Sequence, residues 1–275
     1  MSKLAWSVAS ITDRGLIRRD NQDNYFVSED KRLFVVADGM GGVKGGAEAS
    51  RLAVEAVRQA WIDNPPQFDD HDKIELWLRD AVGKANDSVC DAADLINSES
   101  RMGTTIVVAL QADGNKVHIA HVGDSRAYLL KDGALEALTN DHSMVYEMMQ
   151  HGQLTWQQCK DSVWRSVLTR CIGHERGVAV DQSVVDLLSG EWVVLCSDGL
   201  CGFVTDEKIA ETIADCSTAE EACSKLMLCS MEVGAPDNVT VVAINYWSDD
   251  SADVAKHETM AKTPNSYAQS PSNPL

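Results

Sequence analysis

The sequence is poor in basic residues and has no long apolar run. Lysine and arginine total 24 against 42 aspartates and glutamates, which gives a formal net charge of −18. This imbalance argues against nucleic acid or an anionic membrane surface as the main partner, because like charges repel. No apolar run approaches the roughly 20 residues of a membrane-spanning helix. The N-terminal stretch MSKLAWSVASITDRG lacks a signal-peptide core. We therefore expect a cytoplasmic protein with no membrane association.

The eight cysteines lack the spacing that would give them a structural role. No two are separated as Cys-x-x-Cys, the pattern of zinc ribbons and thioredoxin-like sites. Several lie within apolar runs, where a thiol behaves as a small core residue. Without a secretory signal we expect the thiols to stay reduced.

The apolar pattern changes its period along the chain and predicts an α+β fold. Alternating or continuous apolar runs predict strands, and apolar residues at helical spacing predict helices. Strands are expected at residues 4–10, 25–27, 32–38, 104–110, 116–122, 126–130, 184–188, 191–197 and 240–247. Helices are expected at residues 47–61, 73–97, 206–216 and 218–232. Strands joined by short turns, with the helices grouped in pairs, are typical of antiparallel sheets rather than a doubly wound parallel sheet.

Aspartates beside small or amide residues recur at strand ends and in tight turns. They are Asp23 in RRDNQD, Asp38 in ADGMGG, Asp124 in VGDSR, Asp198 in CSDGL and Asp237 in APDNVT. Strands that end at one rim can aim several carboxylates at one point, and hard divalent cations remove the resulting repulsion. Oxygen ligands favour Mg²⁺ or Mn²⁺ over zinc. Each such aspartate taken alone is also an ordinary turn residue. The aspartates considered singly thus leave two interpretations open, a metal centre and a set of turns.

The order of the motifs closely resembles that of one protein family. The chain contains, in sequence, RRDNQD, ADGMGG, MGTT, GDSR, NDHS, VLTRCIG, SDGL and PDNVT. This series resembles the metal-dependent Ser/Thr protein phosphatases of type 2C, the PPM family, in their compact bacterial form. The resemblance runs from about Trp6 to Tyr246. It implies a four-layer α-β-β-α sandwich of two antiparallel sheets flanked by helix pairs. We expect one catalytic domain, residues 1–247, and a polar tail, residues 248–275, that is disordered.

The resemblance also implies a role for each acidic site. Two tightly bound Mn²⁺ or Mg²⁺ ions are expected, with Asp38 between them. The first ion would be held by Asp38, Asp198 and Asp237. The second would be contacted by Asp23, Asp38 and the carbonyl of Gly39, partly through water. A weaker third ion would be held by Asp124 together with Asp198.

Arg18 matches the phosphate-binding arginine of the family. Its planar fork suits a phosphate dianion better than lysine would. Arg19 remains an alternative, since either side chain could face the cleft. The implied reaction is attack on phosphorus by a water that the two ions bridge, with no phosphorylated protein intermediate.

Other residues depart from the family pattern or have more than one interpretation. Met40 stands where larger relatives carry a histidine that is proposed as the general acid. His121 and His142 are interpreted as hydrogen-bonded histidines near the cleft, with zinc binding and acid catalysis as alternatives. Residues 144–175 match the family's flap, but the usual HPxRN segment reads DSVWRS here. Substrate contacts at this flap are therefore expected to differ.

The implied function is hydrolysis of phosphoserine and phosphothreonine in proteins, reversing a bacterial Ser/Thr kinase. Phosphorylated proteins, a cognate kinase and its substrates are the expected partners, and a monomer is expected. The sequence also leaves two alternative functions. One is an inactive relative that binds phosphopeptides, which the complete set of acidic residues disfavours. The other is a phosphatase of anti-sigma-factor antagonists, whose usual sensory domain has no place in this chain.

Overall fold

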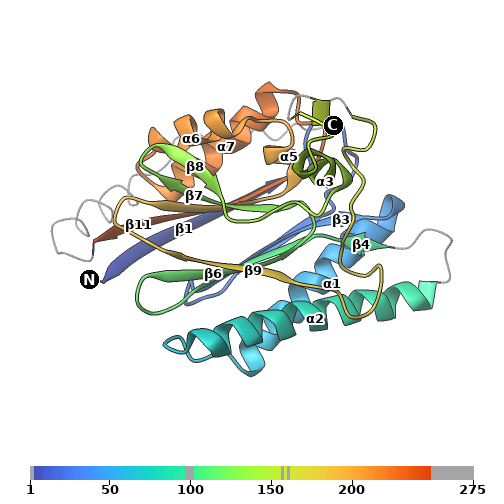
Figure 1. The fold of residues 1–275 in the computed structure, drawn as a ribbon, viewed down its shortest axis with the longest axis horizontal. Helices are drawn as coiled ribbons and strands as arrows, with labels where there is room; N and C mark the ends of the chain where they lie inside the picture. The colour runs from blue at the N-terminus through green and yellow to red at the C-terminus, as the bar shows by residue number, and fades with distance from the viewer. Residues whose placement is uncertain (1–2, 97–101, 156–157, 160–161, 249–275) are drawn as a thin grey trace, which may run out of the picture.

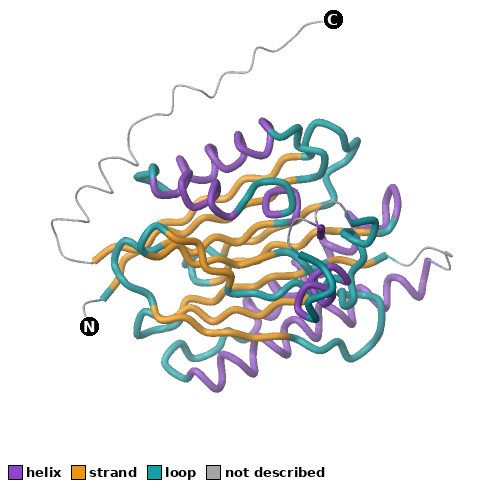
Figure 2. Tube along the Cα trace, turned by 45° about the horizontal axis from the view of Figure 1, so that its top comes forward, coloured by secondary structure: helices purple, strands orange, loops and turns teal. Residues whose placement is uncertain are grey.

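The protein is a stack of four layers. A computed structural model describes residues 3–96, 102–155, 158–159 and 162–248, and Figure 1 shows two facing β-sheets with helices on both outer sides. Figure 2 shows the same layering with the strands in orange between the helices in purple. The arrangement confirms the α-β-β-α sandwich.

The two sheets are antiparallel and each is formed by strands distant in sequence. The first sheet has the order β1-β11-β10-β7-β8, with bounds Leu4–Asp13, Val239–Ser248, Trp192–Cys196, Arg126–Lys131 and Ala134–Ala137. The second has the order β2-β3-β5-β6-β9, with bounds Asp23–Val27, Leu33–Met40, Ile106–Gln111, Lys116–Val122 and Asp181–Asp186. A short strand, β4 (Gly103–Thr104), pairs with the end of β3.

Helix pairs cover the outer faces because each presents one apolar side. Helices α1 (Gly42–Asp63) and α2 (His71–Ile96) lie on the second sheet, and α6 (Asp206–Ala214) and α7 (Ala219–Glu232) lie on the first. In α2 the side chains of Ile74, Leu78, Val82 and Val89 recur at helical spacing and are fully buried. A third apolar cluster fills the space between the sheets. Strands such as β3 are therefore covered on both faces, which explains their continuous apolar sequence.

Most elements lie where the sequence predicts them, and the differences are local. The expected strand at 104–110 is divided into β4 and β5, and the one at 184–188 begins three residues earlier and ends two residues earlier, as β9. Strand β8 and the helix α5 (Asp198–Cys201) have no counterpart among the expected elements, and the helix α3 (Met144–Gln150) opens the expected flap. Strand β11 includes Ser248, one residue beyond the expected domain end, and residues 249–275 of the expected tail lie outside the described residues.

None of the helices in the described part of the chain has the length and apolar character needed to cross a membrane.

Candidate metal centre and phosphate site

The five predicted aspartates come together where strands of both sheets end. Asp23 and Asp38 lie on β2 and β3 of the second sheet. Asp198 follows β10 and Asp237 precedes β11, both in the first sheet. Asp124 lies in the turn that carries the chain from β6 in one sheet to β7 in the other. All but Asp23 line a cleft of about 490 Å³, which Arg18 also lines.

Asp23 and Asp38 face the same point because they are register partners in the antiparallel pair of β2 and β3. Asp23 is buried, and its Oδ2 accepts hydrogen bonds from the hydroxyls of Ser197 and Thr240, each at 2.7 Å. Its Oδ1 is buried without a hydrogen-bond partner among the described residues, as is Oδ1 of Asp198. Buried oxygens of this kind normally have a partner, which indicates space for a cation.

The backbone of Asp38 is fixed by the MGTT motif. Its N–H donates to Thr105 Oγ1 at 3.0 Å, and its carbonyl accepts from the N–H of Thr105 and the hydroxyl of Thr104, both at 2.8 Å. Thr105 Oγ1 in turn lies 2.6 Å from Ser125 Oγ in the GDSR turn. Two motifs that are distant in sequence thus hold the backbone of one acidic residue in place.

Gly39 allows a close approach of three backbone segments beside Asp38. A Cβ atom at this position would lie 2.0 Å from the carbonyl oxygen of Gly46 and 2.7 Å from that of Gln22. No side chain fits in this space, which explains the glycine after the aspartate.

Arg18 lines the same cleft. Its Nη2 is 2.6 Å from Asp237 Oδ2, and 56% of its side chain is exposed. Asn238 holds the loop between β1 and β2. Its side chain accepts a hydrogen bond from the N–H of Gln22 and donates to the carbonyls of Arg14 and Asp20. Arg19 also lines the cleft. The ion pair with Asp237 favours Arg18 as the phosphate-facing side chain.

Burial and mutual repulsion raise the pKa values of four of the aspartates. Burial, followed by repulsion from Asp198 and Asp237, raises the pKa of Asp23 to about 7 despite its hydroxyl partners. Burial and Asp237 raise the pKa of Asp198 to about 6. Burial and neighbouring carboxylates raise the pKa of Asp38 and of Asp124 well above the usual range. Repulsion among these buried carboxylates is unfavourable, and bound divalent cations would neutralise it. The residues therefore fit an oxygen-ligand metal centre.

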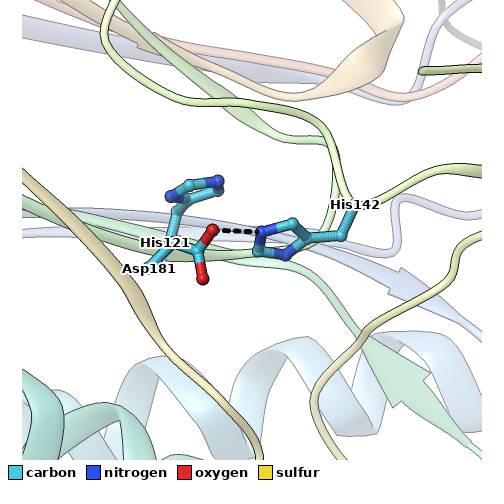
Figure 3. Close-up of side chains that lie close together, drawn as sticks. All are labelled: His121, His142 and Asp181. Carbon is cyan, nitrogen blue, oxygen red and sulfur yellow. Dashed lines mark hydrogen bonds and ion pairs between the residues drawn. The ribbon is translucent and has the colours of Figure 1, made fainter. Parts of the chain in front are cut away.

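A second group of potential ligands lies behind the Asp124 turn. His121, His142 and Asp181 place ligand atoms within 4.8 Å of one another (Figure 3). The two imidazole rings are stacked, with centroids 4.6 Å apart and planes 20° apart. Ring-nitrogen lone pairs lie in the ring plane, so two stacked rings do not converge on an ion about 2.0 Å from each. Both histidines are instead hydrogen-bonded, as the sequence suggested. Burial lowers the pKa of His142 to about 4, which keeps it neutral.

The flap extends the cleft on one side. A pocket of about 190 Å³ shares Arg18, Asp124, Asp198 and Asp237 with the main cleft and continues between α3 and α5. Its further lining includes Val145, Met149, Arg165 and Phe203. The guanidinium of Arg165 lies 5.9 Å from the centre of the Phe203 ring. Trp164, named with Arg165 in the sequence motif DSVWRS, is half exposed and does not line the pocket.

Comparisons with known proteins identify the family. The family model described as Protein phosphatase 2C matches residues 10–232. The chain belongs to this phosphatase family. It is 36% identical to the serine/threonine phosphatase stp of Listeria monocytogenes over 236 residues, which are 85% of this chain and 93% of the relative. It is 35% identical to the serine/threonine protein phosphatase PstP of Mycobacterium tuberculosis over 235 residues, which are 44% of that longer protein.

Solved structures of the phosphatase family have the same fold. A crystal structure of the Mycobacterium tuberculosis PstP matches with a TM-score of 0.76 and 34% identity, covering 88% of this chain and 98% of that one. The catalytic domain of PstP in complex with two manganese ions matches with a TM-score of 0.77 and 32% identity, covering 89% and 99%.

The sequence interpretation missed the residues that orient the acids. These are Thr104, Thr105, Ser125, Ser197, Asn238 and Thr240. Each lies in or beside one of the motifs of the family series, but its partner is distant in sequence, as for Thr105 with Asp38 and Thr240 with Asp23. The motifs therefore indicated these positions without indicating their partners.

Proposed function

We propose that this phosphatase hydrolyses phosphoserine and phosphothreonine in proteins, with divalent cations held by the acidic cluster. The observation that carries the proposal is the gathering of five aspartates from both sheets, two of which have a buried carboxylate oxygen without a partner in the described part of the chain. Such a cluster is destabilising in a protein that binds no cation.

The cation ligands are those that the family resemblance implies. Asp38, Asp198 and Asp237 would hold one ion, and Asp23, Asp38 and the Gly39 carbonyl would contact a second, partly through water. Asp124 and Asp198 would hold a weaker third ion. Mn²⁺ and Mg²⁺ suit these oxygen ligands. The PstP catalytic domain with two manganese ions supports the first two sites.

The bound cations supply Lewis acidity, which activates water and neutralises phosphate charge. Arg18 binds the phosphate through its guanidinium. The ion pair with Asp237 holds this group at the cleft, and the exposed side chain is open to the substrate. The hydroxyls of Ser197 and Thr240 keep Asp23 in one orientation. Thr105 holds the backbone of Asp38 by accepting a hydrogen bond from its N–H. Contacts within the chain thus hold Asp23, Asp38 and Arg18 in place before the substrate binds.

The biological setting is proposed from the same resemblance. Phosphorylated proteins are the substrates, and a cognate Ser/Thr kinase acts in opposition. We further propose that residues 1–247 form the catalytic domain, that the enzyme is a cytoplasmic monomer, and that nucleic acid and membranes are not partners.

The test is phosphate release from phosphoserine and phosphothreonine peptides by the purified chain. We expect turnover with added Mn²⁺ or Mg²⁺, none with EDTA, and none for Asp38→Asn in Mn²⁺. Glu29→Gln, a substitution of an exposed acid, serves as control and keeps full activity. Turnover that persists after chelation and dialysis would contradict the metal-dependent mechanism. Tight phosphopeptide binding without turnover would instead identify an inactive binding protein.

A further inference from the structure

The Gly123–Asp124 turn has a backbone conformation that must be held from outside. Gly123 has a φ of +108°, and a Cβ there would lie 2.6 Å from the side chain of Thr105. The turn also leaves the β-sheet ladder, since it connects β6 in one sheet to β7 in the other. The direction of the Asp124 carboxylate therefore depends on the contacts that Gly123 makes.

His142 makes these contacts on both sides of the Gly123 peptide unit. The backbone N–H of His142 donates to the Gly123 carbonyl at 3.0 Å, and the Gly123 N–H donates to His142 Nδ1 at 3.0 Å. Because Nδ1 accepts a hydrogen bond, the proton of the neutral ring is on Nε2. Nε2 donates to Asp181 Oδ2 at 3.2 Å, the dashed contact in Figure 3.

Hydrogen bonds also join His142 to the C-terminal part of the flap. Arg170 Nη1 donates to Asp181 Oδ1 at 2.5 Å, and the N–H of Thr169 donates to the His142 carbonyl at 2.9 Å. A continuous set of hydrogen bonds thus runs from Arg170 through Asp181 and His142 to the peptide beside Asp124. Hydrogen bonds outside the ligand set generally orient the ligands of a metal centre, and this chain of contacts reaches the segment that carries Asp124.

The neighbours of His142 strengthen the same connection. Asp141 accepts two hydrogen bonds of 2.7 Å from Arg126, two residues after Asp124. The hydroxyl of Ser143 accepts from Tyr146 N–H at the start of α3, and Met144 N–H donates to the carbonyl of Val167. Four consecutive residues, 141–144, therefore join the Asp124 turn to both ends of the flap.

We propose that His142 is a positioning residue that aligns Asp124 with the base of the flap through its bond to Gly123. It has no role as a metal ligand or acid. The inference rests on the proposed function, in which Asp124 holds the weakest cation. Loss of the imidazole lets the turn relax, which weakens that cation and slows turnover, while the phosphate contact of Arg18 is unaffected.

Two variants and a control separate this role from packing. His142→Leu removes both ring hydrogen bonds, whereas His142→Asn keeps an acceptor near the position of Nδ1 for Gly123 N–H. His118→Leu is the matched control, because His118 is also a buried histidine but lies on β6 and contacts His71 of α2 instead of the cleft. We expect His142→Leu to lower kcat and raise the Mn²⁺ concentration for half-activity, each about 10- to 100-fold, with KM nearly unchanged. His142→Asn should recover most of both losses, and His118→Leu should show neither.

A measurement on the metal-free protein tests the geometry without relying on activity. Nitrogen-15 NMR of the wild type should show the Nε2–H tautomer of His142 and a coupling across the hydrogen bond between Gly123 N and His142 Nδ1. Hydrogen exchange at Gly123 N–H should be slow in the wild type and in His142→Asn, and about 10-fold or more faster in His142→Leu.

The outcomes distinguish failure of the inference from failure of the proposed function. A wild-type Nδ1–H tautomer would overturn the inference even if His142→Leu did not fold. Native kcat and Mn²⁺ dependence in a folded His142→Leu would also overturn it. An inactive wild type would contradict the proposed function, and the tautomer and the Gly123 exchange would still decide whether His142 positions the turn.

Discussion

At the scale of single residues, the cleft combines fixed acids with a more exposed arginine. Asp38 is held through its backbone by two threonines, whereas Arg18 is anchored at its guanidinium by Asp237 and has more than half of its side chain exposed. An arginine of this kind contributes to substrate binding through its charge and its fork-shaped geometry. Its contribution is therefore expected in binding more than in the chemical step.

Arg18→Ala should raise KM for phosphopeptides about tenfold and change kcat less, because the lost contact forms equally with bound substrate and transition state. Steady-state kinetics on a phosphothreonine peptide measures both constants. Arg19→Ala, the adjacent control, should leave both near wild-type values. The opposite pattern would assign the phosphate contact to Arg19.

His118 gives the protein a pH-dependent stability that is separate from the cleft. Burial, followed by the charges of His71 and Lys116, lowers its pKa to about 4 from the usual 6.5, and the carboxylate of Glu75, at 4.0 Å, does not compensate. Between pH 4 and 6.5 the unfolded chain binds more protons at this position than the folded chain. The free energy of unfolding therefore rises with pH across this window and is flat above it.

Urea denaturation of the metal-free protein at pH 4.5 and 7.0 should show this contribution. His118→Leu should reduce the difference in unfolding free energy between the two pH values by about 2 kcal/mol. His151→Leu, which replaces an exposed histidine, is the control and should leave the difference unchanged. Equal pH profiles for wild type and His118→Leu would contradict the assignment.

At the scale of secondary-structure elements, sequence patterns predicted the strands that are covered on both faces and the helices that present one apolar side. Strands β3, β5 and β10 are continuous apolar runs, and α1 and α2 have clear helical spacing, so their positions followed from burial alone. Strand β8 is exposed at the edge and α5 has four residues, so neither has an apolar pattern that could be recognised.

The acids could be located from sequence because strand ends are local features. Their partners could not, because the contacts join segments that only the fold brings together. Ser197 and Thr240 meet at Asp23 from positions more than 170 residues away. The link between Gly123 and His142 likewise depends on how the sheets and the flap pack.

Thr240→Val tests this support of β2 by β11. The substitution keeps the shape but removes a donor to Asp23 and a contact with Thr12. We expect a loss of about 1 kcal/mol in unfolding free energy and about a tenfold weaker Mn²⁺ affinity, measured by denaturation and calorimetry. Thr212→Val removes a buried hydroxyl on α6 and should leave Mn²⁺ affinity unchanged. Equal Mn²⁺ affinities for Thr240→Val and the wild type would argue against this supporting role.

At the scale of the whole molecule, the four layers are complete at Ser248, where β11 ends. Residues 249–275 are polar and contain few large apolar side chains. A chain that ends at Ser248 should therefore keep the melting temperature and the turnover of the full chain. Calorimetry and phosphopeptide assays on both chains measure this, and a lower melting temperature of the shorter chain would show that the tail packs on the domain.

The positions of the aspartates have a consequence for how the molecule comes apart. Asp23 and Asp38 belong to one sheet, while Asp198 and Asp237 adjoin strands of the other. Ions bound by aspartates of both sheets would reversibly hold the two sheets together. If the sheets separate before the rate-limiting barrier of unfolding, bound Mn²⁺ should slow the unfolding rate itself and leave the refolding rate nearly unchanged. Stopped-flow unfolding in Mn²⁺ and in EDTA would measure this. Equal unfolding rates would show that the sheets separate only after the barrier.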